Sequence, residues 1–329
     1  MLEDELKKYS SIINKQIEKI MPRKLEPNKE LYSILWEFFD RGGKRLRPAI
    51  AIISYLAVSN KKINEEILSA AAAIEMIHQG TLLHDDIEDD SLERRGKPCI
   101  HRIHGIPIAI NCCDVLYFKA FVPISKLKNE KARLILSESV LKVGEGQAYD
   151  IYWAQNNIWD LKEEDYIKMV ERKTGVLIGA ACAVGAYIGG ANEKVANTLY
   201  NFGKSIGVAF QIQDDVLNVI GDEKKYGKEI GGDITEGKRT LMVIHAINNA
   251  NEKDRERLIE ILSKHTRDPN EIGETIQILK ATGSIDYAVN YAKKIVEKEK
   301  KNLQRVKFKN KEATKILLDL ADFFVKREF

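Results

Sequence analysis

Residues 63–90 read INEEILSAAAAIEMIHQGTLLHDDIEDD, and this stretch decides the fold class. It is rich in apolar residues, its only residue that tends to break a helix is Gly80, and it ends in a cluster of carboxylates. We therefore expect one long helix that carries an acidic group at its end.

The rest of the chain has the same helical character. Apolar residues recur three or four positions apart near both ends, the spacing of one helix face: Leu2, Leu6, Tyr9, Ile13, Ile17 and Ile20, then Ala292, Ile295, Leu303 and Val306. None of the seven prolines lies between Ile124 and Asp268, and no alternating segment is flanked by a hairpin turn signal. The sequence predicts an all-α fold, a helical bundle.

The composition is that of a globular chain with balanced charge. The chain has 329 residues, 44% of them hydrophobic, with 52 Lys and Arg against 49 Asp and Glu and a net charge of +3. This balance does not favour nucleic acid as a partner, and no run of about 18 apolar residues suggests a transmembrane segment. The first ten residues lack the apolar core of a signal peptide, and the four cysteines form neither a disulfide nor a zinc pattern. Because the breaks between helical segments are short, we expect one domain over residues 1–329, located in the cytoplasm.

The first acidic cluster, LLHDDIEDD, ends the stretch quoted above. Asp85 and Asp89 lie four residues apart, so on a helix they share a face, with Asp86 beside them. Like charges at this spacing repel each other, which calls for a compensating cation. A single cluster of this kind is usually a solvated helix surface.

A second cluster, QIQDDVLN, repeats the pattern with Asp214, Asp215 and Asn218. Two such helices facing each other would form a mouth lined with carboxylates over an apolar interior. Magnesium binds carboxylates and shares its other positions with water and phosphate oxygens. Zinc is not supported, because the cysteines lie elsewhere and no HExxH occurs, and an EF-hand loop is excluded because its Gly and final Glu are missing. We therefore predict a magnesium site that serves a phosphorylated substrate.

Basic residues form two groups beside glycines. They are Lys44, Arg45 and Arg47 in GGKRLRP, and Arg94, Arg95 and Lys97 after the first acidic cluster. Glycine lets the chain approach phosphate oxygens, and arginine offers two parallel donors, but no P-loop pattern is present. Together with the carboxylates, these groups predict a site for two polyphosphate groups, one bound through metal and one bound directly by cations.

Six motifs in this order resemble the trans-isoprenyl diphosphate synthases, the family of farnesyl, geranylgeranyl and polyprenyl diphosphate synthases. They are GGKRLRP (42–48), HDDIEDDSLERRGKP (84–98), GEGQAYD (144–150), ERKTG (171–175), FQIQDDVLNVIGD (210–222) and GKEIGGDITEGKRT (227–240). The resemblance implies an isoprenoid synthase fold, all-helical around a deep apolar cavity and commonly in a homodimer. It also implies a magnesium-dependent enzyme that condenses isopentenyl diphosphate with an allylic diphosphate.

The resemblance also implies roles for individual residues. The ligands of about three magnesium ions would be Asp85, Asp89, Asp214 and Asp233, with Asp86 and Asp215 beside them. The residues that hold the allylic diphosphate would be Arg94, Lys173 and Lys228. Those that hold isopentenyl diphosphate would be Lys44, Arg47, His78 and Arg95. The residues that line the reacting carbons would be Thr174 and Gln211, and the polar wall would be completed by Gln147, Asp150 and Lys238.

One position departs from the family pattern at the second acidic motif. Asn218 stands where many members have Asp. An amide can still coordinate weakly or bind a metal-bound water, so we expect activity to be retained. Asn218→Asp should then change turnover little.

The residues before the first acidic cluster predict the product length. Gly80 and Thr81 stand where bulky aromatic residues resemble a floor in members that stop at farnesyl diphosphate. Deeper positions are Ile77 and Ile74, and a neighbouring helix offers Tyr117, Phe118 and Phe121. Because Gly80 and Thr81 are small, we expect an all-trans product longer than farnesyl diphosphate, first geranylgeranyl diphosphate and then a longer polyprenyl chain. Alternatively, Gly80 is a small residue that allows close helix packing.

Two other functions share parts of this pattern. A class I terpene cyclase uses the same metal chemistry but needs no second diphosphate site, so GGKRLRP and Arg95 favour condensation. A non-catalytic subunit of a heteromeric synthase typically has degraded acidic motifs, whereas here the first is intact and the second nearly so.

Overall fold

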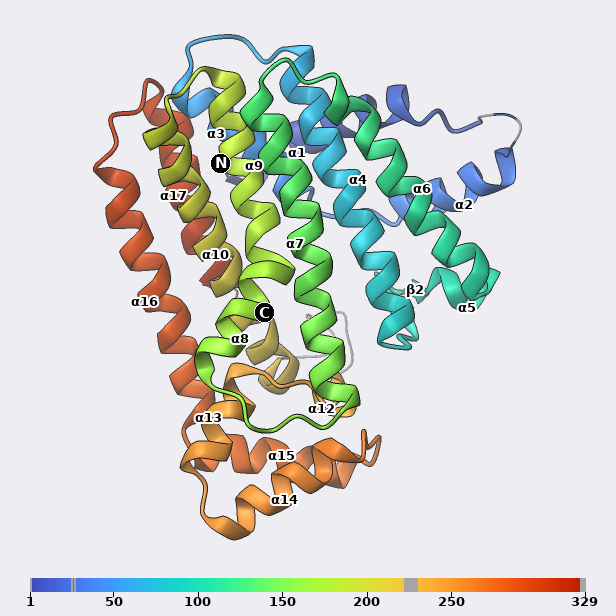
Figure 1. The fold of residues 1–329 in the computed structure, drawn as a ribbon, viewed down its shortest axis with the longest axis vertical. Helices are drawn as coiled ribbons and strands as arrows, with labels where there is room; N and C mark the ends of the chain where they lie inside the picture. Colours follow the sequence, from blue (N-terminus) through green and yellow to red (C-terminus); the bar gives the residue numbers. More distant parts are fainter. Residues whose placement is uncertain (1, 25, 27, 222–229, 326–329) are drawn as a thin grey trace. The chain divides into compact units, whose positions relative to one another are not determined.

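The computed structural model describes residues 2–24, 26, 28–221 and 230–325, and they are mostly helical (Figure 1). Backbone contacts group them into two compact units. Unit 1 comprises the described residues of 1–140, 177–203 and 303–320, and unit 2 comprises those of 141–176, 204–302 and 321–329. The predicted all-α class is confirmed, whereas the single domain and the deep apolar cavity stay predictions.

Unit 1 contains the amino-terminal helices. They are α1 (Leu2–Ile20), α2 (Lys29–Asp40), α3 (Leu46–Val58), α4 (Glu65–Glu88), α5 (Ile100–His104) and α6 (Ile106–Ser125). The unit also holds nearly all of α9 (Val176–Gly189) and the first parts of α7 (Glu130–Gln155), α10 (Glu193–Ile220) and α17 (Lys311–Val325). The only sheet in the described part of the chain is an antiparallel pair of two-residue strands, β1 (Glu93–Arg94) and β2 (Lys97–Pro98).

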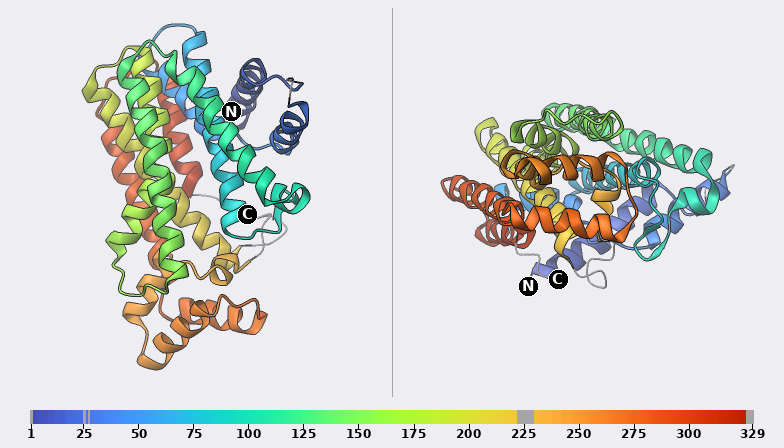
Figure 2. Two further views of the ribbon diagram at one scale, coloured as in Figure 1. Left: turned by 45° about the vertical axis from the view of Figure 1, so that its right-hand side comes forward. Right: turned by 90° about the horizontal axis from the view of Figure 1, so that it is seen from below.

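Helix α4 contains most of the stretch that predicted the fold. Asn64 caps its start by accepting the backbone N–H of Ile67 (3.0 Å). Residues 70–74 are fully buried, and a helix that is apolar on all sides needs neighbours around it. Helices α1, α3 and α6 pack against α4 within unit 1, and α6 runs alongside it (Figures 1 and 2).

Helix α6 has one buried side and many exposed apolar side chains. In the described part of the chain it is the one helix long and apolar enough, by length and composition, to cross a membrane. Core helices of globular proteins meet the same criterion, and Cys112, Leu116 and Ala120 of α6 are fully buried. Phe118 and Val122, in contrast, are exposed. The predicted lack of a transmembrane segment stays a prediction.

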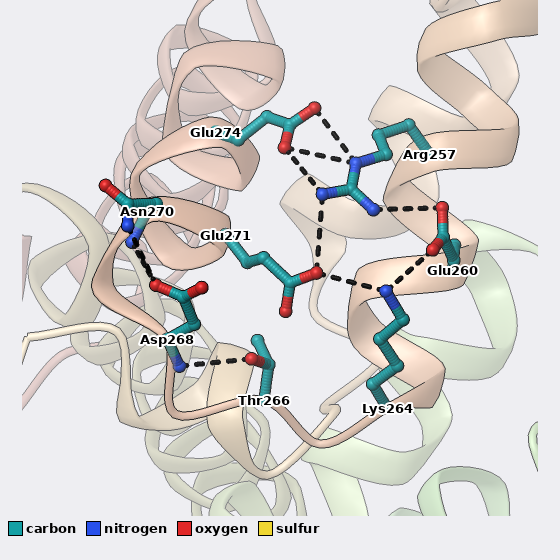
Figure 3. Close-up of polar contacts among 8 residues, drawn as sticks. All are labelled: Arg257, Glu260, Lys264, Thr266, Asp268, Asn270, Glu271 and Glu274. Atoms are coloured by element: carbon teal, nitrogen blue, oxygen red, sulfur yellow. Dashed lines mark hydrogen bonds and ion pairs between the residues drawn. The ribbon is translucent and has the colours of Figure 1, made fainter.

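Unit 2 contains most of the carboxyl-terminal helices. They are α8 (Glu163–Val170), the π-helical turn η1 (Glu171–Gly175), α12 (Gly232–Thr235), α13 (Leu241–Asn249), α14 (Glu252–Ser263), α15 (Pro269–Ala281) and most of α16 (Ser284–Gln304). The remaining parts of α7, α10 and α17 belong here too. Exposed ion pairs join α14 to α15 (Figure 3): Arg257 Nη2 lies 2.9 Å from Glu274 Oε2, and Lys264 Nζ lies 3.1 Å from Glu271 Oε1.

Candidate functional site

The first acidic cluster lies at the carboxyl end of α4. The helix ends at Glu88, and Asp89 is its C-cap, with a backbone N–H that donates to the carbonyl oxygen of Asp85 (2.9 Å). Asp85 and Asp89 are half-buried and Asp86 is buried. Because the carboxyl end of a helix carries partial negative charge, it adds to the repulsion among these carboxylates. A cation bound at this end of α4 would therefore be stabilising.

Arg94 supplies one compensating charge. Its Nε donates to Asp86 Oδ1 (2.7 Å), and its Nη2 contacts the same oxygen. Burial alone would lower the pKa of Arg94, but the nearby Asp86 carboxylate outweighs this effect and raises the pKa above its usual value. The other oxygen, Asp86 Oδ2, is buried without an N–H or O–H partner. It is therefore an acceptor that a further cation could use.

Several arginines of unit 1, among them the predicted diphosphate-binding Arg47 and Arg95, lie near His78. Arg47 Nη1 lies 3.0 Å from His78 Nε2, and because a guanidinium only donates, that ring nitrogen accepts and the proton lies on Nδ1. Burial, together with Arg47 and Arg95, holds the pKa of His78 well below its ordinary value, so the imidazole is neutral. Burial and the neighbouring Arg45 lower the pKa of Arg95 to about 10. This concentration of positive charge suits a polyanionic ligand.

The GGKRLRP motif divides between structural and binding residues. Arg45 is buried, and it donates from Nη1 to Glu75 Oε1 (2.8 Å) and from Nη2 to the carbonyl oxygen of Phe39 (2.9 Å). It also adopts a left-handed backbone conformation (φ 49°) at the N-cap of α3. Lys44 is exposed and Arg47 is half-buried. The structure thus leaves Lys44 and Arg47 as the residues of this motif that can reach a ligand.

The second acidic cluster lies within α10, and neutral groups hold it. Tyr166 Oη donates to Asp215 Oδ2 (2.7 Å), and Gln211 Nε2 donates to Asp215 Oδ1 (2.9 Å). Thr174 Oγ1 in turn donates to Gln211 Oε1 (2.9 Å). Burial raises the pKa of Asp215 to about 6; the two hydrogen bonds oppose this rise and the Asp214 charge adds to it. Sequence reasoning missed Tyr166, because a single tyrosine 49 residues before Asp215 gives no signal of a buried hydroxyl-to-carboxylate bond.

Lys173 and Thr174 belong to η1, the π-helical turn. Lys173 Nζ donates to Asp150 Oδ2 (2.7 Å), so two predicted residues meet in unit 2. A side chain at Gly146 of α7 would place its Cβ 2.2 Å from the backbone nitrogen of Lys173. Gly146 therefore allows η1 to approach α7 closely. Single π-helical turns are frequent at functional sites, and the sequence pattern did not reveal this one.

Asn218 positions the segment that carries Asp233. Its Oδ1 accepts the backbone N–H of Asp233 (3.0 Å), and its side chain is buried. Lys238 Nζ lies 3.9 Å from Asp233 Oδ1. The amide oxygen of Asn218 is thus already engaged in holding α12. Two other predicted residues are Gln147, which is half-buried on α7, and Lys228, which lies outside the described residues.

Tyr117 of α6 occupies the space beside Gly80. A Cβ at Gly80 would lie 3.1 Å from Tyr117 Cε1 and 3.5 Å from the carbonyl oxygen of Cys113. The Tyr117 ring also contacts His84, with 5.5 Å between the ring centroids. The structure therefore favours the packing alternative for Gly80. The predicted role of Gly80 in product length stays a prediction.

Of the other residues predicted to set product length, some are buried in unit 1 and others are exposed. Ile74 and Ile77 are fully buried in unit 1. Thr81 Oγ1 donates to the carbonyl oxygen three residues earlier in α4 (2.7 Å). Phe118 and Phe121 are 68% and 40% exposed, so neither lines the interior of unit 1.

The side chains of the acidic clusters fit a divalent cation whose remaining coordination positions are filled by other ligands. Among the described residues, no three His, Cys, Asp or Glu side chains gather closely enough to hold a metal by themselves. Magnesium at phosphate sites commonly takes only one or two carboxylates and fills its remaining positions with water and phosphate oxygens. The carboxylates at the end of α4 and the unsatisfied Asp86 Oδ2 suit this mode of binding.

Comparison with known proteins points to one family. The polyprenyl synthetase family model matches residues 28–279. The geranylgeranyl pyrophosphate synthetase of Pyrococcus horikoshii superposes with a TM-score of 0.90 at 36% identity, covering 99% of this chain and 98% of that one. The geranylgeranyl pyrophosphate synthase of Corynebacterium glutamicum, solved with isoprenyl diphosphate and magnesium, superposes with a TM-score of 0.87 at 25% identity over 100% of both chains.

Relatives identified by sequence carry related names. The short chain isoprenyl diphosphate synthase of Methanocaldococcus jannaschii is 43% identical over 323 residues, 97% of this chain and 96% of its own. The geranylgeranyl diphosphate synthase of Methanosarcina mazei is 37% identical over 100% of this chain and 98% of its own. The geranylfarnesyl diphosphate synthase of Aeropyrum pernix is 34% identical over 87% of this chain and 91% of its own.

Proposed function

Because the chain belongs to the polyprenyl synthetase family, we propose that it condenses isopentenyl diphosphate with an allylic diphosphate to give an all-trans prenyl diphosphate. It is a prenyltransferase of the geranylgeranyl or polyprenyl diphosphate synthase type. The observation that best supports these substrates is the division of charge within unit 1. Carboxylates at the end of α4 suit a metal-bound diphosphate, and the guanidiniums around His78 suit a second one bound directly. A terpene cyclase would need only the first.

The family uses a divalent metal, and we propose magnesium, in about three ions per site. Asp85 and Asp89 would hold two of these ions in unit 1, and Asp214, with Asp233 nearby, would hold the third in unit 2. When bound, the metal would neutralise the diphosphate that leaves the allylic substrate. The negative end of α4 favours cation binding at Asp85 and Asp89 for the reason given above.

Two cations already held by carboxylates would bind the allylic diphosphate. Arg94 is paired with Asp86 and Lys173 with Asp150. Each pairing restrains a long side chain before the substrate arrives, so less side-chain entropy is lost on binding. The diphosphate of isopentenyl diphosphate would bind a separate set, Lys44, Arg47, His78 and Arg95.

Departure of the diphosphate from the allylic carbon leaves a carbocation. The double bond of isopentenyl diphosphate then attacks this cation, and a proton is lost from the adduct to the released pyrophosphate. Thr174 and Gln211, hydrogen-bonded to each other, would line the reacting carbons with oriented neutral dipoles. Water must be kept away because it would trap the cation, and the apolar residues of α4 provide surroundings of that kind.

We propose a product of geranylgeranyl length or longer, with Tyr117 as the first side chain that limits it. Its ring, contributed by α6, lies against Gly80 of α4, 3.1 Å from the position that a Cβ at Gly80 would take. Tyr117→Ala should therefore lengthen the product by at least one isoprene unit. The double variant Gly80→Phe, Tyr117→Ala should place an aromatic ring in the same space again, now from α4, and should shorten the product.

The matched control for product length is Lys126→Ala, which changes an exposed side chain at the carboxyl end of the same helix. It should leave the distribution of chain lengths unchanged. Products are read by chromatography after removal of the diphosphate. If Tyr117→Ala gave the wild-type distribution, Tyr117 would not limit the chain.

We propose that the exposed apolar side of α6 is covered by a second copy of the chain. The exposed large apolar residues of this helix are Ile106, Ile108, Ile110, Phe118, Phe121 and Val122. Several large apolar side chains exposed along one helix are typical of an interface. Val122→Asp should lower the mass measured by light scattering from dimer to monomer.

All four cysteines are free and buried, in keeping with the proposed cytoplasmic location.

The reaction itself is tested with purified protein, magnesium, isopentenyl diphosphate and each allylic primer in turn. Elongated linear products are the expected result. Cyclised hydrocarbon would instead identify a terpene cyclase, and no turnover with any primer would identify a non-catalytic subunit. Removing the metal with EDTA should abolish elongation, and added magnesium should restore it.

A further inference from the structure

Glu75 of α4 is a buried carboxylate that no predicted role includes. Its side chain is 1% exposed, and Oε1 accepts from Arg45 Nη1 (2.8 Å) and from Gln79 Nε2. Oε2 is buried and has no hydrogen-bond partner. Arg45 itself is 3% exposed. A charge pair this deeply buried is costly to desolvate, so its geometry should serve more than local stability.

Gln79 extends this contact to a residue of the diphosphate group. A carboxylate accepts but cannot donate, so the amide nitrogen of Gln79 must face Glu75. The amide oxygen then faces the other way, and it accepts from Arg95 Nη1 (3.4 Å). Glu75 therefore determines the orientation of Gln79, and Gln79 in turn offers Arg95 an acceptor.

Arg95 needs such restraint because its surroundings are unfavourable. Its backbone is left-handed (φ 57°), and burial and repulsion by Arg45 lower its pKa to about 10. A Cβ at Gly43 would lie 3.0 Å from Arg95 Nη2 and 3.3 Å from Arg45 Nη1. The two guanidiniums thus share the space beside Gly43. The ring of Phe38, whose centroid is 5.6 Å from Arg95 Cζ, covers another side.

We propose that Glu75 and Gln79 are positioning residues for the diphosphate of isopentenyl diphosphate. Glu75 holds Arg45 and orients Gln79, and Gln79 holds Arg95 in place against repulsion from Arg45. The guanidinium of Arg95 is then in position before the substrate binds. This inference rests on the proposed function, and it concerns residues of unit 1 alone.

The main test is Gln79→Leu, which removes the acceptor but keeps the pair between Arg45 and Glu75. We expect KM for isopentenyl diphosphate to rise about tenfold, the usual effect of losing one hydrogen bond to a charged group. KM for the allylic substrate and kcat should stay within about twofold of wild type. Calorimetry should show the dissociation constant for isopentenyl diphosphate rising by the same factor.

A double-mutant cycle separates positioning from general packing. If Gln79 acts through Arg95, adding Gln79→Leu to Arg95→Gln should change KM for isopentenyl diphosphate by less than about twofold. Independent, multiplying effects would overturn the inference, as would an equal rise in both KM values. A wild-type enzyme that makes no elongated product would refute the proposed function. If the wild type is active and Gln79→Leu has the same KM for isopentenyl diphosphate, only this inference is refuted.

Two further variants serve as second probe and control. Glu75→Gln should also raise KM for isopentenyl diphosphate, and it should lower the thermal midpoint because Arg45 loses its buried partner. The control is Glu66→Gln. Glu66 lies on the same helix and accepts the backbone N–H of Lys128 (2.8 Å), away from the cations. This variant should leave both KM values unchanged.

Discussion

The two acidic motifs share a sequence pattern, but the fold compensates their charge in different ways. In unit 1, Asp86 is paired with the guanidinium of Arg94 at the end of a helix. In unit 2, Asp215 lies inside a helix and accepts from two neutral donors, Tyr166 and Gln211. The two neutral donors offset burial only in part, so the pKa of Asp215 rises to about 6. The motif thus places the carboxylates, and the surrounding helices decide whether a cation or neutral donors contact them.

The largest expected effect comes from removing one proposed metal ligand from each motif. Asp85→Asn should lower kcat/KM by about a thousandfold, because the first motif is proposed to hold two ions. Asp214→Asn should lower it by roughly ten- to a hundredfold, since the second motif would hold one. Steady-state kinetics at saturating magnesium measures both. Asp90→Asn, at the exposed residue after Asp89, is the control. Equal losses of kcat/KM for Asp85→Asn and Asp214→Asn would contradict the proposed difference between the two motifs in the number of ions bound.

A smaller effect is expected on stability, again larger in unit 1. Arg94→Gln leaves Asp86 buried without its ion pair, which should cost about 3 kcal/mol. Tyr166→Phe removes one of two donors to Asp215 and should cost about 1–2 kcal/mol. Thermal unfolding monitored by circular dichroism gives the order of the two midpoints. A lower midpoint for Tyr166→Phe than for Arg94→Gln would reverse the comparison.

The raised pKa of Asp215 predicts a pH dependence. In the unfolded chain the pKa of an aspartate is about 4, whereas in the folded protein the pKa of Asp215 is about 6. The folded state therefore holds this proton more tightly, and the associated stability is present below pH ~4 and is lost as the pH rises through ~6. Metal-free wild type should lose stability relative to Asp215→Asn over this range. A constant difference between the two midpoints would contradict the shift.

The smallest effect is expected from the exposed ion pairs between α14 and α15 (Figure 3). Arg257 contacts Glu260, Glu271 and Glu274, but exposed pairs of this kind are screened by solvent. Arg257→Gln should shift the thermal midpoint by less than about 2 °C, and less again in high salt. A shift as large as that of Arg94→Gln would show that burial does not explain the difference between paired carboxylates.

Local patterns in the sequence predicted the positions of the acidic motifs and of the basic residues around them. They did not predict the partners of buried charges. Arg45 and Glu75 are 30 residues apart, and Tyr166 and Asp215 are 49 apart. Contacts over such distances depend on how helices pack, and residue spacing within one helix carries no information about that. For the same reason, the grouping of Lys44, Arg45 and Arg47 by charge did not show that Arg45 is buried; only the resemblance left Arg45 out of the binding residues.

The product-length argument shows the same limit. The small size of Gly80 was visible in the sequence and suggested open space on α4. The space is filled from α6, whose Tyr117 ring lies within 3.1 Å of where a Cβ would be. A residue's own volume does not describe the volume around it, because neighbouring helices supply the other walls.

The sequence by itself determined the helical class, the sites of the two carboxylate motifs and the resemblance to prenyl diphosphate synthases. These properties follow from residue type and from spacing along one helix, which are local. Only the tertiary structure decided which carboxylate meets a cation and which meets a tyrosine, that a π-helical turn presents Lys173, and that Glu75 and Gln79 hold Arg95. These contacts join residues of different segments, and they exist only where packing brings the segments together.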